Sequence, residues 1–499
     1  MKRKNTLSAD APLLLQEHRR PVSRREFLAQ GFITGAGLVM APTMLSLMRA
    51  STARAQGVGC VLRAGAGLIP FLCMDLSGGA NIAGSNVLVG GPGGQLDLLL
   101  PAGYEKLGLP STLLPSLPGQ VNTELGLAFH ADSAFLRGIL SKTSAATRVN
   151  VNGVVICARS ENDTGNNPHN PMYGINKAGA DGNLVTLIGT EPSESGGNSA
   201  APMATIDPAA RPVKIDRPSD VTGLVDTGRL VQLLAPQDAA AVMAAVEQIS
   251  EAKLQHMSED AIVEQLIRCG YVESTALVAA FGDPTQLDPL ADPDITGATG
   301  IFSAGELGQD KFRKTASVMK LAVNGFAGAG TIELGGYDYH DGTRATGEVR
   351  DFEAGVAMGA VLEYAARRGQ QLMLYVFSDG ALDSDGSLDN SVNGRGKGNW
   401  KGDSQSTAAV FMLVYDPAGR PQLVSPARQQ LGYYRRSGDV ETASSPIANN
   451  VTLLADAIVL NYMALHDDVG RFTTALPTQG LGASINSLIA FAPIRATPA

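Results

Sequence analysis

Residues 331–380 read TIELGGYDYHDGTRATGEVRDFEAGVAMGAVLEYAARRGQQLMLYVFSDG. The run from Thr331 to Leu334 is β-prone and ends at two glycines. Apolar residues then recur at helical spacing from about Val349 to Arg368, and Leu372 to Phe377 form a second, continuous apolar run. Strand, helix and strand in this order predict a β-α-β unit whose two strands are parallel.

Polar residues follow both predicted strands. Asp338 and His340 come after the first strand, and Ser378 and Asp379 come after the second. Because the carboxyl ends of parallel strands meet at one edge of a sheet, we expect Asp338, His340 and Asp379 to lie close together. Two carboxylates and an imidazole can hold a divalent metal ion, whereas the alternative is a pair of ordinary loop carboxylates and a helix N-capping role. His169, in a polar loop after another short apolar run, is a further candidate ligand, with a solvated loop histidine as its alternative.

Three continuous apolar runs are predicted to be neighbouring strands of one sheet. They span residues 68–76, 372–377 and 408–415. Runs of this kind are typical of strands that are buried on both faces. Asp75 lies near the end of the first run and Asp403 stands before the third, so we expect Asp75, Asp379 and Asp403 at one edge. The pattern of strands and helices therefore predicts an α/β fold with a central, mostly parallel sheet between helices.

Three other segments are assigned from their composition. We expect one α/β domain that spans residues 56–499. The helical patterns of residues 226–275 predict a helical insertion in this domain. Residues 190–225 are rich in Ser, Gly and Pro, a composition that predicts a long surface connection or the base of an insertion. Residues 381–407 predict a loop of low hydrophobicity, in which the DxDG pattern at 383–386 lacks the glutamate that closes an EF-hand calcium loop.

Residues 1–55 have the features of a twin-arginine signal peptide. VSRREFL, residues 22–28, contains the pair Arg24 and Arg25, and a moderately apolar stretch follows to Met48. Ala53-Arg54-Ala55 then matches a cleavage motif. We expect the twin-arginine (Tat) translocase to export the protein to the periplasm or beyond, with a retained membrane anchor as the alternative.

The charge of the chain argues against a nucleic-acid partner. The full sequence carries 39 Lys and Arg against 48 Asp and Glu, a net charge of −9. Without residues 1–55, 30 basic and 45 acidic residues remain, which is a net charge of about −15. The four cysteines show no CxxC spacing, so no zinc or redox motif is expected, and disulfides or free thiols both stay open.

The motifs, taken in order, resemble an uncharacterised, twin-arginine-exported branch of the alkaline-phosphatase and sulfatase-like superfamily. Five segments carry the resemblance: DLSGGAN at 75–81, AFHADSAFLRGI at 128–139, NPHNPMYG at 167–174, GGYDYHD at 335–341 and YVFSDG at 375–380. They are similar to that branch's glycine loop after the first strand, its "LHPALAPL" helix start, its "SHF" loop, its "GWDTH" motif and its "FSEFG" segment. The resemblance implies a metal-centred pocket at the carboxyl ends of the strands.

This resemblance implies hydrolysis of a small phosphate or sulfate ester with a divalent metal, Zn, Ca or Mn. The implied metal ligands are Asp75, His169, Asp338, His340, Asp379 and Asp403, and the implied catalytic residues are Ser77 as nucleophile and Asn81. The sequence also departs from the family pattern at two positions. Ser404 follows Asp403 where a histidine is expected, and Gly380 follows Asp379 where the "SDHG" pattern of phosphatases has a histidine. The alternative is therefore a non-catalytic envelope protein that binds an envelope partner or serves in secretion or assembly.

Overall fold

The computed structural model describes residues 68–160, 167–224, 284–340 and 342–495. The predicted signal peptide and the predicted helical insertion at 226–275 lie outside the described residues. Within the described ranges, no helix has both the length and the apolar character that a membrane span needs.

Eight strands form one central sheet in the order β12-β4-β11-β8-β1-β7-β5-β6. Their bounds are β1 Phe71–Leu76, β4 Val151–Ile156, β5 Val185–Gly189, β6 Val213–Lys214, β7 Ala327–Leu334, β8 Leu372–Ser378, β11 Val410–Tyr415 and β12 Gln430–Leu431. β11 is antiparallel to both of its neighbours, β4 and β8, and the other neighbouring pairs are parallel. The predicted α/β fold is confirmed, and the three apolar runs are the neighbouring strands β11, β8 and β1.

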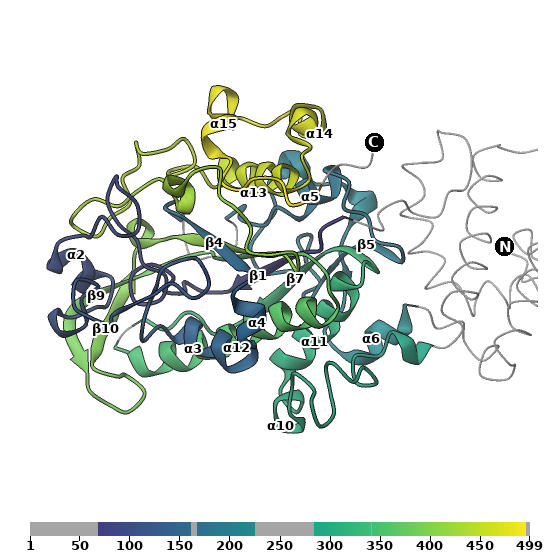
Figure 1. The fold of residues 1–499 in the computed structure, drawn as a ribbon, viewed down its shortest axis with the longest axis horizontal. Helices are drawn as coiled ribbons and strands as arrows, with labels where there is room; N and C mark the ends of the chain where they lie inside the picture. Colours follow the sequence, from purple (N-terminus) through teal and green to yellow (C-terminus); the bar gives the residue numbers. More distant parts are fainter. Residues whose placement is uncertain (1–67, 161–166, 225–283, 341, 496–499) are drawn as a thin grey trace, which may run out of the picture.

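Helices cover both faces of this sheet (Figure 1). The helices α3 (Ala134–Lys142), α11 (Asp310–Val323) and α12 (Arg344–Arg367) pack on one face, and α5 (Met172–Lys177) and α13 (Val451–Leu465) pack on the other. Successive side chains of β1 alternate between the two resulting cores, with Leu72 and Met74 in the first and Phe71 and Cys73 in the second. A continuous apolar run is needed because both faces of the strand are buried.

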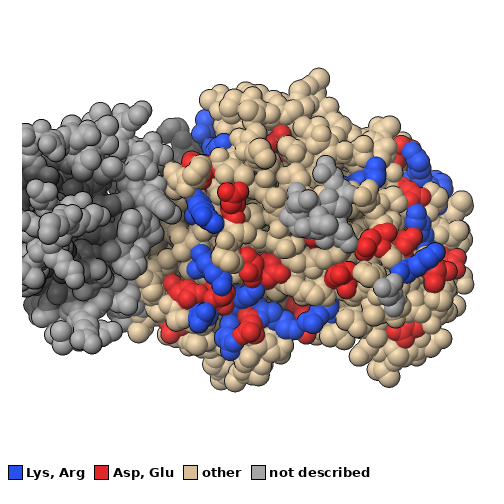
Figure 2. All heavy atoms as spheres, turned by 180° about the vertical axis from the view of Figure 1, so that it is seen from behind, with Lys and Arg blue, Asp and Glu red and all other residues tan. Residues whose placement is uncertain are grey.

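The remaining described elements are short or lie outside the sheet. They are α2 (Pro101–Lys106), α4 (Ala145–Arg148), α6 (Pro218–Gly223), α10 (Ala304–Leu307), α14 (Phe472–Ala475), α15 (Ile485–Leu488), β2 (Val121–Asn122), β3 (Phe129–His130), β9 (Leu382–Asp389) and β10 (Lys397–Asp403). On the face shown in Figure 2, Lys and Arg side chains are interspersed with Asp and Glu side chains. Such mixed charge gives that face no extended basic area among the described residues.

The prediction that residues 381–407 form a loop is wrong. β9 and β10 pair as an antiparallel hairpin within this segment. Its anchors are Trp400, which is 1% exposed and stacks on the Arg344 guanidinium at 4.4 Å, and the fully buried Lys397. One aromatic ring and buried charges attach the hairpin to α12, so it needs few apolar residues. A prediction from hydropathy therefore misses its strands.

Helices α3 and α12 approach each other so closely that backbone contacts backbone at glycines. A Cβ atom on Gly355 of α12 would collide with the carbonyl oxygen of Phe135, and one on Gly359 would lie 2.7 Å from the carbonyl oxygen of Ile139. Both carbonyls belong to α3, so the crossing has no room for a methyl group.

We expect Gly355→Ala to lower the free energy of unfolding by about 2 kcal/mol. Alanine has a higher helix propensity than glycine, by about 1 kcal/mol, but the collision of its Cβ with the backbone of α3 should outweigh this gain. Denaturant unfolding would measure this change. The matched control is Gly305→Ala in α10, where an added Cβ meets no atom within 4 Å and stability should stay the same or rise. Equal stability of the two variants would contradict the close crossing.

Candidate functional site

Asp338, His340 and Asp403 lie together at the carboxyl edge of the sheet. One ligand atom from each residue lies within 4.8 Å of the other two, and His340 Nε2 is 2.9 Å from Asp338 Oδ1. We call these residues the Asp-His-Asp group. Asp403 ends β10, just before the antiparallel β11, and a strand that runs opposite to β8 begins at the edge where β8 ends. The predicted position of Asp403 is therefore confirmed.

The segment between β7 and α12 alternates buried and accessible side chains. Tyr337 and Tyr339 are buried, while Asp338 is exposed and His340 is half-buried. Alternation of this kind follows from an extended backbone, in which successive side chains point to opposite sides. The two tyrosines fix the backbone, and the two candidate ligands face solvent.

Hydrogen bonds hold Tyr339 in place beneath the group. Its hydroxyl donates to Asp351 Oδ1 at 2.6 Å and accepts from the backbone N–H of Asn81 at 2.9 Å. Asn86 Nδ2 donates to the other carboxylate oxygen of Asp351 at 2.7 Å. Burial raises the pKa of Asp351 to about 7, while the Tyr339 hydrogen bond opposes this rise. Sequence reasoning missed this network because its members lie far apart in the chain and carry no motif.

Asp75 and Asp379 lie at the same edge but have other partners. Both are fully buried. Asp75 Oδ2 accepts from the backbone N–H groups of Asn198 and Ser199 at 2.8 and 2.7 Å, and Ser199 Oγ donates to Asp75 Oδ1 at 3.1 Å. Asp379 accepts from the N–H of Gly78 at 2.7 Å and from Asn198 Nδ2 at 3.2 Å. The two carboxylates thus attach the Asn198–Ser199 segment to the strand ends.

The predicted surface connection at 190–225 is therefore wrong in part. Ser195 and Ser199 are buried, and β6 and α6 also lie in this range. Its Ser- and Gly-rich composition permits a tight approach to Asp75, because a Cβ on Gly197 would lie only 2.6 Å from Asp75 Oδ2.

The buried Asp75 should make stability depend on pH. Burial raises its pKa to about 7 from 3.8, although the Ser199 backbone hydrogen bond lowers it and Asp379 raises it further. Between these values the native state binds more protons than the unfolded state, so the stabilising contribution is full below pH 4 and is lost as the pH rises to 7. In the wild type, this effect should lower the free energy of unfolding by an amount on the order of 4 kcal/mol between pH 4 and 7. We expect Asp75→Asn to abolish this decrease.

Denaturant unfolding of both proteins at each pH would measure this difference. Asparagine can keep the geometry, because Oδ1 can accept from both backbone N–H groups while Nδ2 donates to Ser199 Oγ. Parallel pH profiles of the variant and the wild type would contradict the assignment to Asp75.

The structure places the other predicted residues in separate surroundings. His169 is 2% exposed and stacks on the ring of Phe377, with 5.8 Å between ring centroids. Neither ring nitrogen has a hydrogen-bond partner, and burial lowers the pKa of His169 to about 3. Ser77 Oγ donates to Glu333 Oε1 at 2.9 Å, and Asn81 is buried with Nδ2 bonded to Ser85 Oγ. The structure therefore brings together three of the six predicted ligands.

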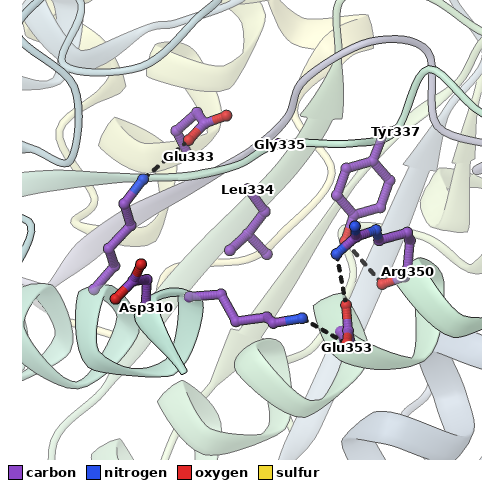
Figure 3. A pocket seen from close by; sticks show the side chains of 9 residues that line it. Asp310, Glu333, Leu334, Gly335, Tyr337, Arg350 and Glu353 are labelled. Carbon is purple, nitrogen blue, oxygen red and sulfur yellow. Dashed lines mark hydrogen bonds and ion pairs between the residues drawn. The ribbon is translucent and has the colours of Figure 1, made fainter. Parts of the chain in front are cut away.

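The pocket that Glu333 lines has internally paired charges (Figure 3). Its volume is about 100 Å³. Lys314 lies 3.3 Å from Glu333, and Glu353 lies 2.5 Å from Lys311 and 3.3 Å from Arg350. A ligand would have to displace these ion pairs, so this pocket is a weaker candidate than the Asp-His-Asp group.

A larger open pocket of about 410 Å³ borders the Asp-His-Asp group. Its lining residues are Arg159, Ser160, Gly380, Ala381, Asp403, Ser404, Gln405 and Ser406. Asp403 belongs both to the group and to this lining. A molecule in the pocket would therefore contact one of the three candidate metal ligands.

The donor set suits a transition metal or zinc. Two carboxylates and one imidazole match the oxygen and nitrogen donors that Zn²⁺ and Mn²⁺ accept, whereas Ca²⁺ prefers oxygen donors alone. Three protein ligands at an accessible site also leave room for a water or substrate, as catalytic zinc sites do.

The sequence motifs can now be placed in the structure. GGYDYHD supplies two members of the group and the segment before β11 supplies the third, whereas DLSGGAN and YVFSDG supply the buried Asp75 and Asp379. Comparisons of the chain with protein-family models, with curated proteins and with solved structures found no match.

Proposed function

We propose that the protein is a metal-dependent hydrolase of small phosphate or sulfate esters. The observation that carries this proposal is the Asp-His-Asp group at the border of an open pocket of about 410 Å³. Sites that combine a pocket with a few convergent polar groups are the usual places for ligand binding. The twin-arginine signal of the sequence supports action in the periplasm or outside the cell, after export by the Tat translocase.

The residues of the group would hold the metal and expose it to the substrate. A bound divalent cation supplies Lewis acidity and neutralises negative charge on the oxygens of the ester. Tyr339, fixed by Asp351, orients the segment that carries Asp338 and His340. Asp403 is the last residue of β10, so its position depends on how the β9–β10 hairpin is anchored.

Metal removal tests the proposal directly. We expect the purified protein to contain about one divalent ion per chain by elemental analysis and to hydrolyse 4-nitrophenyl phosphate or 4-nitrophenyl sulfate. A chelator should lower that hydrolysis to background, and added Zn²⁺ or Mn²⁺ should restore it. A protein that binds no ion and hydrolyses neither ester would overturn the proposal. It would then support the second candidate, a non-catalytic envelope protein, which is favoured by Ser404 in place of a histidine.

A further inference from the structure

We propose that the pocket beside Asp403 recognises a carboxylate on the organic part of the substrate. This inference rests on the proposed ester hydrolysis and adds the substrate class, an ester whose leaving group carries a second acidic group. The argument starts from Arg159, the basic residue of the pocket lining.

Arg159 is held in place by neutral partners. Its Nη1 donates to Asn449 Oδ1 at 3.1 Å, and its Nη2 donates to Gln405 Oε1 at 2.7 Å. None of the ion pairs among the described residues involves Arg159. The guanidinium is therefore oriented without being neutralised, which leaves its full charge for a ligand.

Protons of the guanidinium also remain for a ligand. Each Nη nitrogen carries two protons, and the two hydrogen bonds use one proton on each. The Nε–H has no hydrogen-bond partner. A planar fork with free protons matches the two oxygens of a carboxylate.

Ser160 adds an unused polar group to the same lining. It is 3% exposed, and its hydroxyl has no hydrogen-bond partner. A buried hydroxyl without a partner costs free energy, which a bound ligand oxygen would recover. Because Ser160 and Arg159 both line this pocket, both can contact one ligand.

The size and charge of the pocket favour a carboxylate-bearing organic group. A volume of about 410 Å³ is typical of pockets for small organic molecules and exceeds what a bare ester oxyanion requires. One uncompensated guanidinium balances one negative charge, which a carboxylate carries. The ester would lie at the Asp-His-Asp group, and the carboxylate would lie at Arg159.

Calorimetric titration with two phosphonates that cannot be hydrolysed tests this assignment. We expect the metal-loaded wild type to bind 4-carboxyphenylphosphonate about tenfold more tightly than phenylphosphonate, and we expect Arg159→Gln to bring the ratio of the dissociation constants to about one. Arg159→Lys keeps the positive charge but lacks the planar guanidinium, so it should retain part of the preference. This variant replaces Arg159→Gln in the test if the glutamine variant does not fold. Arg313→Gln, at an exposed ion pair on α11, is the matched control and should keep the full preference.

Equal binding of the two phosphonates by the wild type, or a preference that survives Arg159→Gln, would overturn the inference. Hydrolysis of 4-nitrophenyl esters without a preference for the carboxylate would overturn this inference alone. A preference that depends on Arg159 in a protein that hydrolyses no ester would keep the carboxylate subsite and overturn the proposed hydrolysis.

Discussion

His340→Ala should release the bound metal and lower kcat/KM for ester hydrolysis by at least about 100-fold. His340 supplies the nitrogen donor of the Asp-His-Asp group, and alanine would leave two exposed carboxylates with no third ligand. Two oxygen donors bind Zn²⁺ or Mn²⁺ weakly in competition with water. Elemental analysis and steady-state kinetics with 4-nitrophenyl phosphate would measure both effects.

The β9–β10 hairpin offers a matched pair of carboxylates as a control. Asp403→Asn should lose metal as His340→Ala does, because Asp403 belongs to the group. Asp385→Asn should change neither metal content nor activity, because Asp385 is exposed and bonds only locally, to Ser387. If Asp385→Asn released the metal and Asp403→Asn did not, the ion would belong to the DxDG segment at 383–386 instead.

The central sheet could be predicted from the sequence because its signal is local. β1, β8 and β11 are buried along their whole length, so each one appears as a continuous apolar run. The right-handed β-α-β rule then placed the ends of β7 and β8 at one edge. α12 begins at Arg344, five residues before the predicted start, because its first turns bury polar residues such as Glu348 rather than apolar ones.

The candidate site could be predicted only in part. One local rule, a carboxylate next to a strand end, selected Asp75, Asp379, Asp338 and Asp403 alike. What separates them is non-local, because the N–H groups that occupy Asp75 come from Asn198 and Ser199, more than 120 residues away. No spacing in the sequence shows which carboxylates will accept from distant backbone N–H groups and which will lie beside His340.

Glu348→Gln should lower the free energy of unfolding by about 3–5 kcal/mol, the usual cost of breaking a buried ion pair. Glu348 Oε1 accepts from Arg344 Nη2 at 2.7 Å and from Lys397 Nζ at 2.8 Å, and Oε2 accepts from Arg137 Nη2 at 2.8 Å. Burial raises the pKa of Glu348, but Arg344 and Lys397 outweigh it and hold this pKa below its usual range. Glutamine keeps the shape and removes the charge, which takes from the buried Arg344 its carboxylate partner and leaves the buried Lys397 only the more distant Asp132, at 3.4 Å.

The same substitution should also weaken metal binding, because Lys397 begins β10 and Asp403 ends it. The matched control is Glu353→Gln, also on α12, whose ion pairs with Lys311 and Arg350 are partly exposed and should contribute less than about 1 kcal/mol. Denaturant unfolding and metal titration of both variants would separate the two expectations. A Glu348→Gln protein with lower stability and unchanged metal affinity would show that Asp403 is positioned by β11 rather than by the buried charges of the hairpin.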